Sequence, residues 1–508
     1  MLPSYIPAKG PKPDFPSTGP GIDDAYLNFP KAGLYRSVAD TLPNVGDVNV
    51  MTLNFYPPFT PLGRNAQWQA VNKALGANMK INVVAFADYP AKFNTVSASG
   101  DLPDMMYLQA VPNLPQFLKA QCADLTPYLS GDNIKAYPNL ANIPPTPWMN
   151  TVYGGGIFGI PIPRPAVGTM MYVNRNRWDK EVGAAVLPKN GADFKKMLLQ
   201  LTHPERNQWA IASEAGYALG MNWNWWQEMF NGPNTWRLDI SGKLIHARET
   251  PEYRAAVAYV HDLYGAGVFH PNALTYAAPT AWKSDLIAGK FALNEEPWAS
   301  YQEYATTRGP QAVPPVQVTT IPQFTFDGKG KAPHFLYKEV IGITVLKKGS
   351  PDRIKAMLNI LNYMAAPFGS NEGLLMDYGV EGPDFAWNGK GNPIPTRAGI
   401  ADTYVPWKYV SQHPQPLYDP KVPAYAKQAQ ADQQLAIPQG VQDPTLGYYS
   451  ATNGSKGTIL TSAFMDAMTS IIVGRSPMTD YDQAVKEWVS KGGDQIRGEY
   501  MQAMAAAK

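Results

Sequence analysis

Tryptophan stands beside amide and carboxylate side chains in two stretches of this chain. In the first, Asn222–Trp226, three indoles alternate with asparagine, and in the second Glu296 and Pro297 precede Trp298. A sugar ring has an apolar C–H face and a rim of hydroxyls, so a saccharide site combines flat aromatic rings with amide and carboxylate partners. The pattern predicts such a site, with these candidate residues: Asn54, Tyr56, Trp223, Trp225, Trp226, Glu296, Trp298 and Trp387.

Ordinary packing is the alternative for every one of these rings, because large aromatic side chains also fill cores and loops. Trp298 is the strongest candidate. It follows a strand-like run, Phe291–Asn294, and the polar residues Glu295 and Glu296.

Glu295 and Glu296 come nearest to a catalytic arrangement. A glycosidase needs two acids that flank the scissile bond. Neighbouring residues of a strand point to opposite faces, so this pair cannot act together, although a second acid could come from elsewhere in the chain. A glycoside-active enzyme therefore remains an alternative function.

Metal ions, nucleotides and reactive thiols have no support in the sequence. The six histidines are dispersed, and the single cysteine, Cys122, lies in an apolar run that predicts a buried thiol. The segment Gly154–Gly159 matches G-x-G-x-x-G, but Pro161 and Pro163 follow it and prevent the helix that a dinucleotide site requires. We therefore expect no cofactor, no metal and no catalytic residue.

Length and composition limit the class of protein. A chain of 508 residues is too long for one ordinary core, so two or more lobes are expected. Charged residues make up 17% of the chain, and the net charge of +2 comes without any run of Lys or Arg, so nucleic acid is not an expected partner. No stretch approaches the roughly 18 consecutive apolar residues that a membrane span needs.

The first residues lack the basic and apolar segments of a signal peptide, so either the protein is cytosolic or the sequence starts after a cleavage site. Residues 1–46 begin with a stretch rich in Pro and Gly. We expect them to form an N-terminal leader or tether outside the first core.

Three strand-like runs open the regular structure, and helical patterns separate them. The runs are Val48–Phe55, Ile81–Ala85 and Asp104–Leu108. This alternation predicts a parallel α/β sheet, in which ligands bind at the carboxyl ends of the strands. The loops after Phe55, Phe86 and Leu108 are therefore a candidate site.

The rest of the chain is mostly helical. Thr250 with Pro251, and Ser350 with Pro351, predict helix starts, because a hydroxyl caps the first turn and proline suits the first helical position. Further helices are expected after Thr479 and Asp494. The sequence thus predicts an α/β fold with a helical C-terminal portion.

Several segments resemble motifs of one family, and they occur in that family's order. These segments are Ala98–Asp104 (ASGDLPD), Ala123–Leu129 (ADLTPYL), Gly156–Pro161 (GIFGIP), Met171–Arg175 (MYVNR), Asp285–Leu293 (DLIAGKFAL), Glu296–Trp298 (EPW) and the helices after Gly474. On these segments the chain resembles the family 1 extracellular solute-binding proteins, the carbohydrate-binding group that includes the maltose-binding protein.

The resemblance implies a periplasmic-binding-protein-like fold with two α/β lobes joined by crossing hinge segments. If the family's lobe organisation is applied to this chain, lobe one comprises residues 47–165 and 293–345, and lobe two comprises residues 166–292 and 346–508. The strand Phe291–Asn294 then becomes a crossover, with Trp298 just beyond it at the cleft.

The implied function is binding without chemistry. The protein would be an extracytoplasmic monomer at the cell surface or in the periplasm, with its signal peptide removed. It would bind an oligosaccharide between the lobes and deliver it to the permease subunits of an ABC importer, touching the membrane only through a tether or the permease. A glycoside-active enzyme and a binder of a non-sugar solute, such as a peptide, are the alternatives.

Overall fold

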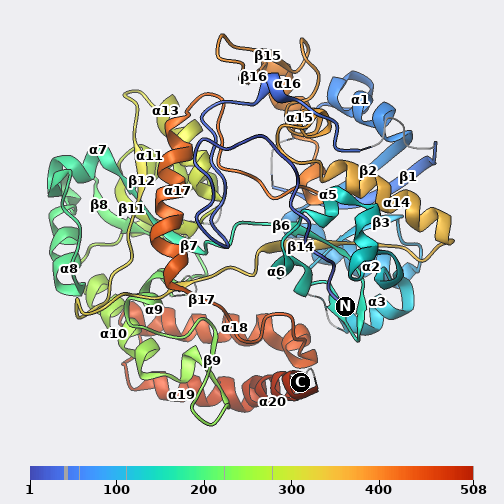
Figure 1. Cartoon of the computed structure of the whole chain (residues 1–508). Coiled ribbons are helices and arrows are strands. Elements are labelled where there is room, and N and C mark those ends of the chain that lie inside the picture. Colours follow the sequence, from blue (N-terminus) through green and yellow to red (C-terminus); the bar gives the residue numbers. More distant parts are fainter. Residues whose placement is uncertain are drawn as a thin grey trace. The chain divides into compact units, whose positions relative to one another are not determined.

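The computed structural model describes residues 1–38, 44–55, 58–109, 111, 113–221, 224–276 and 279–506 (Figure 1). The chain divides into two compact units. Unit 1 comprises residues 1–17, 23–165 and 338–426, and unit 2 comprises residues 18–22, 166–337 and 427–508.

The sheet of unit 1 has five strands in the order β2-β1-β3-β14-β6. Strands β1 (Gly46–Asn54), β2 (Ala77–Ala85) and β3 (Met105–Leu108) are parallel, as the sequence predicts. Strand β14 (Val340–Leu346) runs antiparallel between β3 and β6 (Ile160–Pro163). The carboxyl ends of β1, β2 and β3 therefore share one edge of the sheet.

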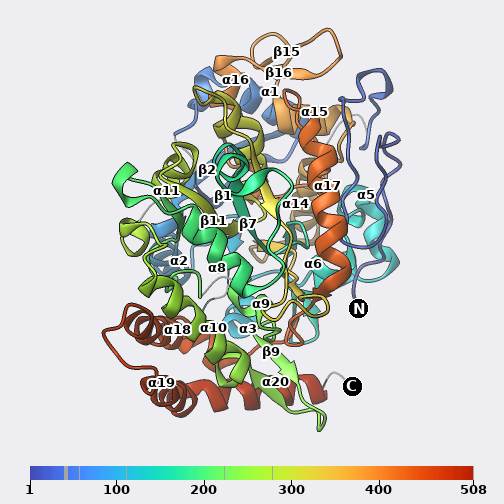
Figure 2. The ribbon, with the colours of Figure 1, turned by 90° about the vertical axis from the view of Figure 1, so that its left-hand side faces the viewer.

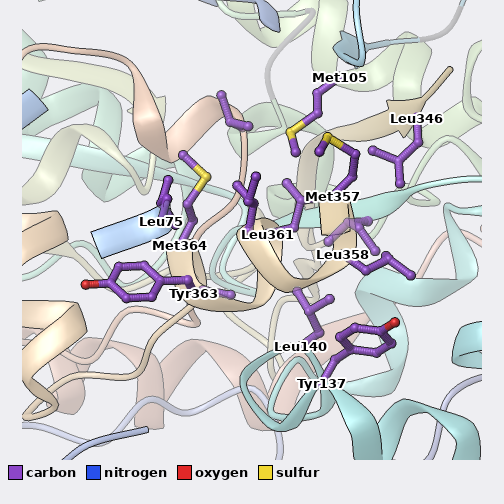
Figure 3. Close-up of a cluster of buried hydrophobic side chains, with 14 of the residues drawn as sticks. Leu75, Met105, Tyr137, Leu140, Leu346, Met357, Leu358, Leu361, Tyr363 and Met364 are labelled. Atoms are coloured by element: carbon purple, nitrogen blue, oxygen red, sulfur yellow. The ribbon is translucent and has the colours of Figure 1, made fainter. Parts of the chain in front are cut away.

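Local sequence explains the helices that cover this sheet. The Asn65 side chain caps α1 (Ala66–Leu75) by accepting from the Trp68 N–H, and Gly76 ends the helix with a positive φ of 58°. Ser350 caps α14 (Pro351–Met364) in the same way. Figure 3 shows apolar side chains of α14 among those of α1, β3 and β14, which together form the core of unit 1.

The other helices and strands of unit 1 are short. They are α2 (Tyr89–Ser99), α3 (Leu114–Gln121), α4 (Thr126–Leu129), α5 (Pro138–Ala141), α6 (Pro145–Met149), β4 (Val152–Tyr153), β5 (Gly156–Ile157), α15 (Asn371–Tyr378), β15 (Phe385–Trp387), β16 (Pro393–Pro395) and α16 (Arg397–Asp402).

The sheet of unit 2 has four strands in the order β12-β7-β11-β8. Strand β11 (Phe291–Pro297) pairs in parallel with β8 (Trp209–Ala212), and β7 (Thr169–Asn174) runs antiparallel to both β11 and β12 (Val318–Ile321). The carboxyl ends of β8 and β11 share one edge.

Helices and small strands complete unit 2. They are α7 (Arg175–Trp178), α8 (Gly191–Gln200), α9 (Trp225–Met229), β9 (Trp236–Leu238), β10 (Leu244–His246), α10 (Pro251–Gly265), α11 (Pro279–Ile287), α12 (Ser300–Gln302), α13 (Gly309–Gln311), β13 (His334–Phe335), β17 (Gly440–Val441), α18 (Ala451–Ile472), α19 (Asp480–Trp488) and α20 (Asp494–Ala506). The predicted starts at Thr250 and Asp494 agree with α10 and α20. Helix α17 (Ala424–Ala436) contains the last crossing from unit 1 to unit 2.

The division into units corrects the expected lobe boundaries. Residues 293–337 belong to unit 2 because β11 is an interior strand of its sheet, and residues 346–426 belong to unit 1 because α14 fills that unit's core. The run Phe291–Asn294 is therefore not a crossover. Apart from the short segment 18–22, which belongs to unit 2, the chain passes between the units after Pro165, Tyr337 and Ala426 instead.

The described part of the expected leader packs mostly on unit 1, and its residues 18–22 belong to unit 2. Isolated bridges join Pro3 to Gly131, Ala25 to Leu417 and Tyr35 to Ser370. Tyr26 and Phe29 are buried in an aromatic cluster with Phe368 and Tyr418. The described part of this segment has only a short 3-10 helix, Lys31–Gly33, and its aromatic side chains attach it to the unit.

The G-x-G-x-x-G segment forms a hairpin turn between β4 and β5. Gly154 and Gly155 adopt positive φ angles of 55° and 83°, and no helix follows them, as the two prolines predict. Within the described ranges, no helix is both long and apolar enough to cross a membrane.

Candidate functional site

Two exposed aromatic rings lie at the carboxyl edge of the unit 1 sheet. Phe55 follows β1 and Phe86 follows β2, and because these strands are parallel the two rings meet. Their centroids are 4.6 Å apart with planes inclined by 30°, and the side chains are 48% and 45% exposed. Large apolar groups at this degree of exposure offer a flat surface to a ligand.

Tyr409 extends this pair on the same unit. Its ring meets Phe55 edge-on at 5.5 Å, and its backbone carbonyl accepts a 2.8 Å hydrogen bond from Thr52 Oγ1 of β1. The Arg164 guanidinium lies 5.6 Å from the ring centroid of Tyr409. Phe55, Phe86 and Tyr409, which we call the aromatic platform, thus stand beside a charged hydrogen-bond donor.

Three of the predicted positions relate to this edge. The loops after Phe55 and Phe86 are where the strand pattern places them, and Asn54 is the half-buried last residue of β1. Tyr56 and Trp223 lie outside the described residues. The sequence identified the loops but not Phe55, Phe86 and Tyr409 themselves as candidates.

Polar side chains gather at the carboxyl edge of the unit 2 sheet. The buried Glu296 carboxylate accepts from Asn294 Nδ2 at 2.9 Å, from Ser300 Oγ at 2.8 Å and from the Tyr304 hydroxyl, and Lys283 Nζ lies 3.6 Å away. These donors fix the turn after β11. Glu296 thus holds the edge together, and its contact with a sugar hydroxyl stays a prediction.

Glu214 is a second acid at this edge, and sequence reasoning missed it. It follows β8, whose Ala212 is the register partner of Asn294. Burial, and then the negative charge of Glu296, raise the pKa of Glu214 to about 7, while Lys283 opposes the shift. Only the pairing of β8 with β11 brings this acid near Glu296, so no local pattern could have found it.

Two polar atoms at the same edge have no hydrogen-bond partner among the described residues. These are Ser213 Oγ and Asn294 Oδ1, both buried. A buried polar atom left unpaired costs roughly 1–3 kcal/mol, so both atoms are suited to a water molecule or to a ligand hydroxyl.

Glu295 points to the opposite face of β11, as strand alternation predicts. Its Oε1 accepts from Thr169 Oγ1 at 3.0 Å and from the backbone N–H groups of Asn224 and Trp225, both at 2.7 Å. Burial raises its pKa well above the ordinary range, although these backbone donors oppose the shift. Glu295 therefore anchors the start of α9.

The burial of Trp225 and Trp226 contradicts their prediction as stacking surfaces. Both rings are about 1% exposed, and Trp226 Nε1 donates to the Leu219 carbonyl at 3.0 Å. The ring of Trp225 contacts Phe324. Helix α9 is buried along its whole length, so these indoles belong to the core of unit 2.

Trp387 is half-buried and lies in unit 1 at the aromatic cluster that holds the N-terminal segment. Its ring contacts Phe29 at 5.7 Å and Phe385 at 5.1 Å, and Lys31 Nζ lies 4.5 Å above it. These contacts give the ring a structural role, and its assignment as a sugar-stacking residue stays a prediction.

Trp298 lies at the unit 2 edge, directly after β11. Its N–H donates to the Gly168 carbonyl at 2.9 Å, and its ring packs edge-on against Tyr301 with centroids 5.2 Å apart. The side chain is 4% exposed. Trp298 therefore remains a proposed contact residue, placed beside Glu296 and the unpaired Asn294 oxygen.

Metal and thiol chemistry find no favourable arrangement in what the structure describes. No group of three or more His, Cys, Asp or Glu side chains there is placed to hold a metal ion. Cys122 is buried, and burial raises the pKa of its thiol to about 12, so the reactive thiolate is not populated at neutral pH.

These features define a class of protein. Two α/β units, between which the chain passes more than once, form the periplasmic-binding-protein-like fold. The model of the bacterial extracellular solute-binding protein family matches residues 66–380. The chain belongs to this family of solute-binding proteins.

Proteins that are similar to this chain support the family assignment. Lipoprotein LipO of Bacillus subtilis (strain 168) is 23% identical over 469 residues, which cover 86% of this chain and 88% of LipO. The N-glycan transport solute-binding protein NgtS of Streptococcus pneumoniae has a TM-score of 0.64 at 16% identity, covering 91% of this chain and 100% of NgtS. FusA of S. pneumoniae in complex with kestose has a TM-score of 0.65 at 16% identity, with coverage of 91% and 100%.

Proposed function

We propose that this protein binds an oligosaccharide outside the cytoplasm and delivers it to the permease of an ABC importer. The observation that carries the proposal is the aromatic platform at the carboxyl edge of the unit 1 sheet. Family membership supports the transport role, and the N-glycan and kestose in the names of two similar structures support the class of ligand.

Recognition would use both sheet edges. The exposed faces of Phe55 and Phe86 suit the apolar face of a sugar ring. Ser213 Oγ and Asn294 Oδ1 suit its hydroxyls, because pairing them removes the cost of leaving buried polar atoms unsatisfied. Trp298 would add a further ring at the second edge.

A thermal-shift screen against a panel of oligosaccharides tests this function. A ligand at 100 times its dissociation constant stabilises the folded state by about 2.7 kcal/mol, so a cognate saccharide raises the melting temperature. Oligopeptides form the comparison arm. Stabilisation by peptides and by no saccharide would contradict the proposal and favour a peptide-binding protein.

Absence of enzymatic activity is part of the proposal. Glu214 near Glu296 gives unit 2 two acids in one place, which a hydrolase could use. We expect the protein to leave a bound oligosaccharide intact, and chromatography of the saccharide after long incubation measures this. Release of shorter sugars that stops in Glu214→Gln would show that the protein is an enzyme.

Location and assembly follow from the same proposal. We expect the protein at the cell surface or in the periplasm, held at the membrane by a tether or by the permease. We also expect it to be a monomer, which light scattering of the purified protein measures.

A further inference from the structure

Unit 2 contains a cavity of about 290 Å³ away from its sheet edge. It lies between the β9–β10 hairpin and the helices α18, α19 and α20, which stay side by side in both views (Figures 1 and 2). Asn453, Gly457 and Thr461 line it from one face of α18, at a spacing of four residues. Small and polar side chains on this face leave room that a larger residue would fill.

The cavity contains an arginine without a charged partner. Arg248 is 7% exposed, and its Nη2 donates to Thr461 Oγ1 at 3.0 Å. The guanidinium lies over two rings, 4.8 Å from the centroid of Phe464 and 5.3 Å from that of Trp488. In the part of the chain that the structure describes, Arg248 forms no ion pair, and the nearby acids Glu249 and Glu252 pair with Arg497 and Arg237 instead.

Other charged groups around the cavity do not neutralise this arginine. Glu249 pairs with Arg497, and the Asp443 carboxylate, which also lines the cavity, is held by the N–H and Oγ1 of Thr445 at 2.8 and 2.7 Å and is not among the groups that act on the pKa of Arg248. Burial lowers the pKa of His246, so its ring is neutral near pH 7. Removing a guanidinium from water costs several kcal/mol unless an anion compensates it, so this cavity is suited to an anionic partner.

Aromatic rings form the wall beside Arg248. His246 lies between two indoles, with centroids 4.6 Å from Trp236 and 4.4 Å from Trp488, and Tyr500 contacts Trp236 at 6.2 Å. A ligand here needs an anionic end for the guanidinium and a flat apolar body for the rings. A guanidinium binds a carboxylate through two parallel N–H bonds, which suits a planar anion better than a spherical one.

We propose that this cavity is a second ligand site, for a small aromatic carboxylate bound by Arg248. The carboxylate takes the unpaired N–H groups of the guanidinium, and the ring of the ligand lies against Trp236 and Trp488. This site shares no residue with the sheet edges of the proposed saccharide site and does not depend on that function.

Benzoate and 4-bromobenzoate are the probes for the test. We expect benzoate, but not chloride at the same ionic strength, to raise the melting temperature of the full chain in a concentration-dependent way. In crystals of the parent protein grown with 4-bromobenzoate, the anomalous signal should place bromine inside this cavity. Bromine only at other positions, or equal stabilisation by chloride, would overturn the proposal.

Variants of Arg248 test whether its guanidinium binds the carboxylate of benzoate. Arg248→Lys keeps the charge but loses the two-bond geometry, so its affinity for benzoate should fall at least about tenfold, and Arg248→Met should abolish the shift. The control Arg64→Met removes an exposed arginine of unit 1 and should respond like the parent. If Arg248→Met does not fold, two other measurements test the assignment. They are the position of bromine in the crystals and the benzoate response of Thr461→Val, in which Nη2 has lost its protein acceptor. A full benzoate response in Arg248→Lys would contradict the assignment.

Discussion

Phe86 tests the proposed saccharide site at the scale of one residue. Phe86→Ala removes half of an exposed stacked pair and should weaken saccharide binding about fivefold or more, because a well-placed aromatic contact contributes more than about 1 kcal/mol. Isothermal titration calorimetry measures the change. Phe326→Ala is the matched control, since Phe326 is also exposed and stacks on Phe230 with centroids 4.4 Å apart, but belongs to neither sheet edge. Equal loss in both variants would argue against the aromatic platform.

Glu296 should matter more for folding than for binding. Glu296→Gln keeps one acceptor oxygen and replaces the other by an amide NH2, so either Ser300, which donates to Oε2, or Asn294 and Tyr304, which donate to Oε1, lose their acceptor. We expect the free energy of unfolding to fall by about 1–3 kcal/mol, measured by urea denaturation. An unchanged unfolding free energy together with weaker saccharide binding would return Glu296 to the direct role that the sequence suggested.

Glu214 makes stability depend on pH in a definite direction. Its pKa is raised from 4.5 in an unstructured chain to about 7 in the folded protein, so folding takes up a proton between these values. The folded state therefore loses stability relative to the unfolded state as pH rises from about 4.5 to 7, and the loss is complete above that range.

The substitution Glu214→Gln removes this dependence. We expect the melting temperature of Glu214→Gln to exceed that of the parent by more at pH 8 than at pH 5. A difference that is the same at both pH values would show that Glu214 is not perturbed in the folded protein.

Residue types alone predicted the kind of site, but they did not predict which aromatic residues are exposed at the sheet edges. Trp225 and Trp226 have the composition of a sugar site, but Glu295 anchors α9 so that both indoles face the core. Asn54 precedes Phe55, but nothing in the local sequence shows that Phe55 meets Phe86, because their contact depends on the register of β1 with β2.

At the scale of elements, helix α16 packs closely against the backbone of Asp384 at Gly399. A Cβ atom there would lie 1.8 Å from the Asp384 carbonyl oxygen, which is backbone and cannot move aside. Gly399→Ala should therefore destabilise unit 1 by about 1–3 kcal/mol in urea denaturation.

Gly389 provides the matched control, because a Cβ atom there meets nothing within 4 Å. Gly389→Ala should leave the unfolding free energy nearly unchanged. Similar losses in the two alanine variants would mean that helix α16 does not pack against the Asp384 backbone as described.

Elements with local signals were predictable, and those that depend on distant partners were not. Gly76, Thr250 and Ser350 end or begin helices through their own backbone and side-chain bonds, so the chain shows them directly. Strand β14 lacks such a signal for its place between β3 and β6, because both partners lie far away in the sequence.

At the scale of the molecule, the proposed function predicts a change of dimensions. One saccharide that contacts the sheet edges of both units must favour conformations in which both can reach it. We expect the radius of gyration from small-angle scattering to decrease with the cognate saccharide. The Phe86→Ala variant at the same saccharide concentration should show a smaller decrease. If the parent protein binds the saccharide and its radius of gyration does not decrease, the site belongs to one unit only.

The division of the chain was the least predictable feature. Similarity to a family suggested two lobes, but the change of unit after Tyr337 follows from which sheet each strand joins. That choice is made by long-range pairing and burial, which no window of sequence contains.

The strand order also has a consequence for synthesis on the ribosome. The sheet of unit 2 has all four strands once Ile321 has emerged, whereas the sheet of unit 1 waits for Leu346, although its first strand begins at Gly46. Until β14 arrives, β3 and β6 both present unpaired backbone edges to the surrounding cytoplasm. The unit that the ribosome starts first is thus the one whose sheet is finished last, and its nascent form is the stage most exposed to aggregation and most in need of a chaperone.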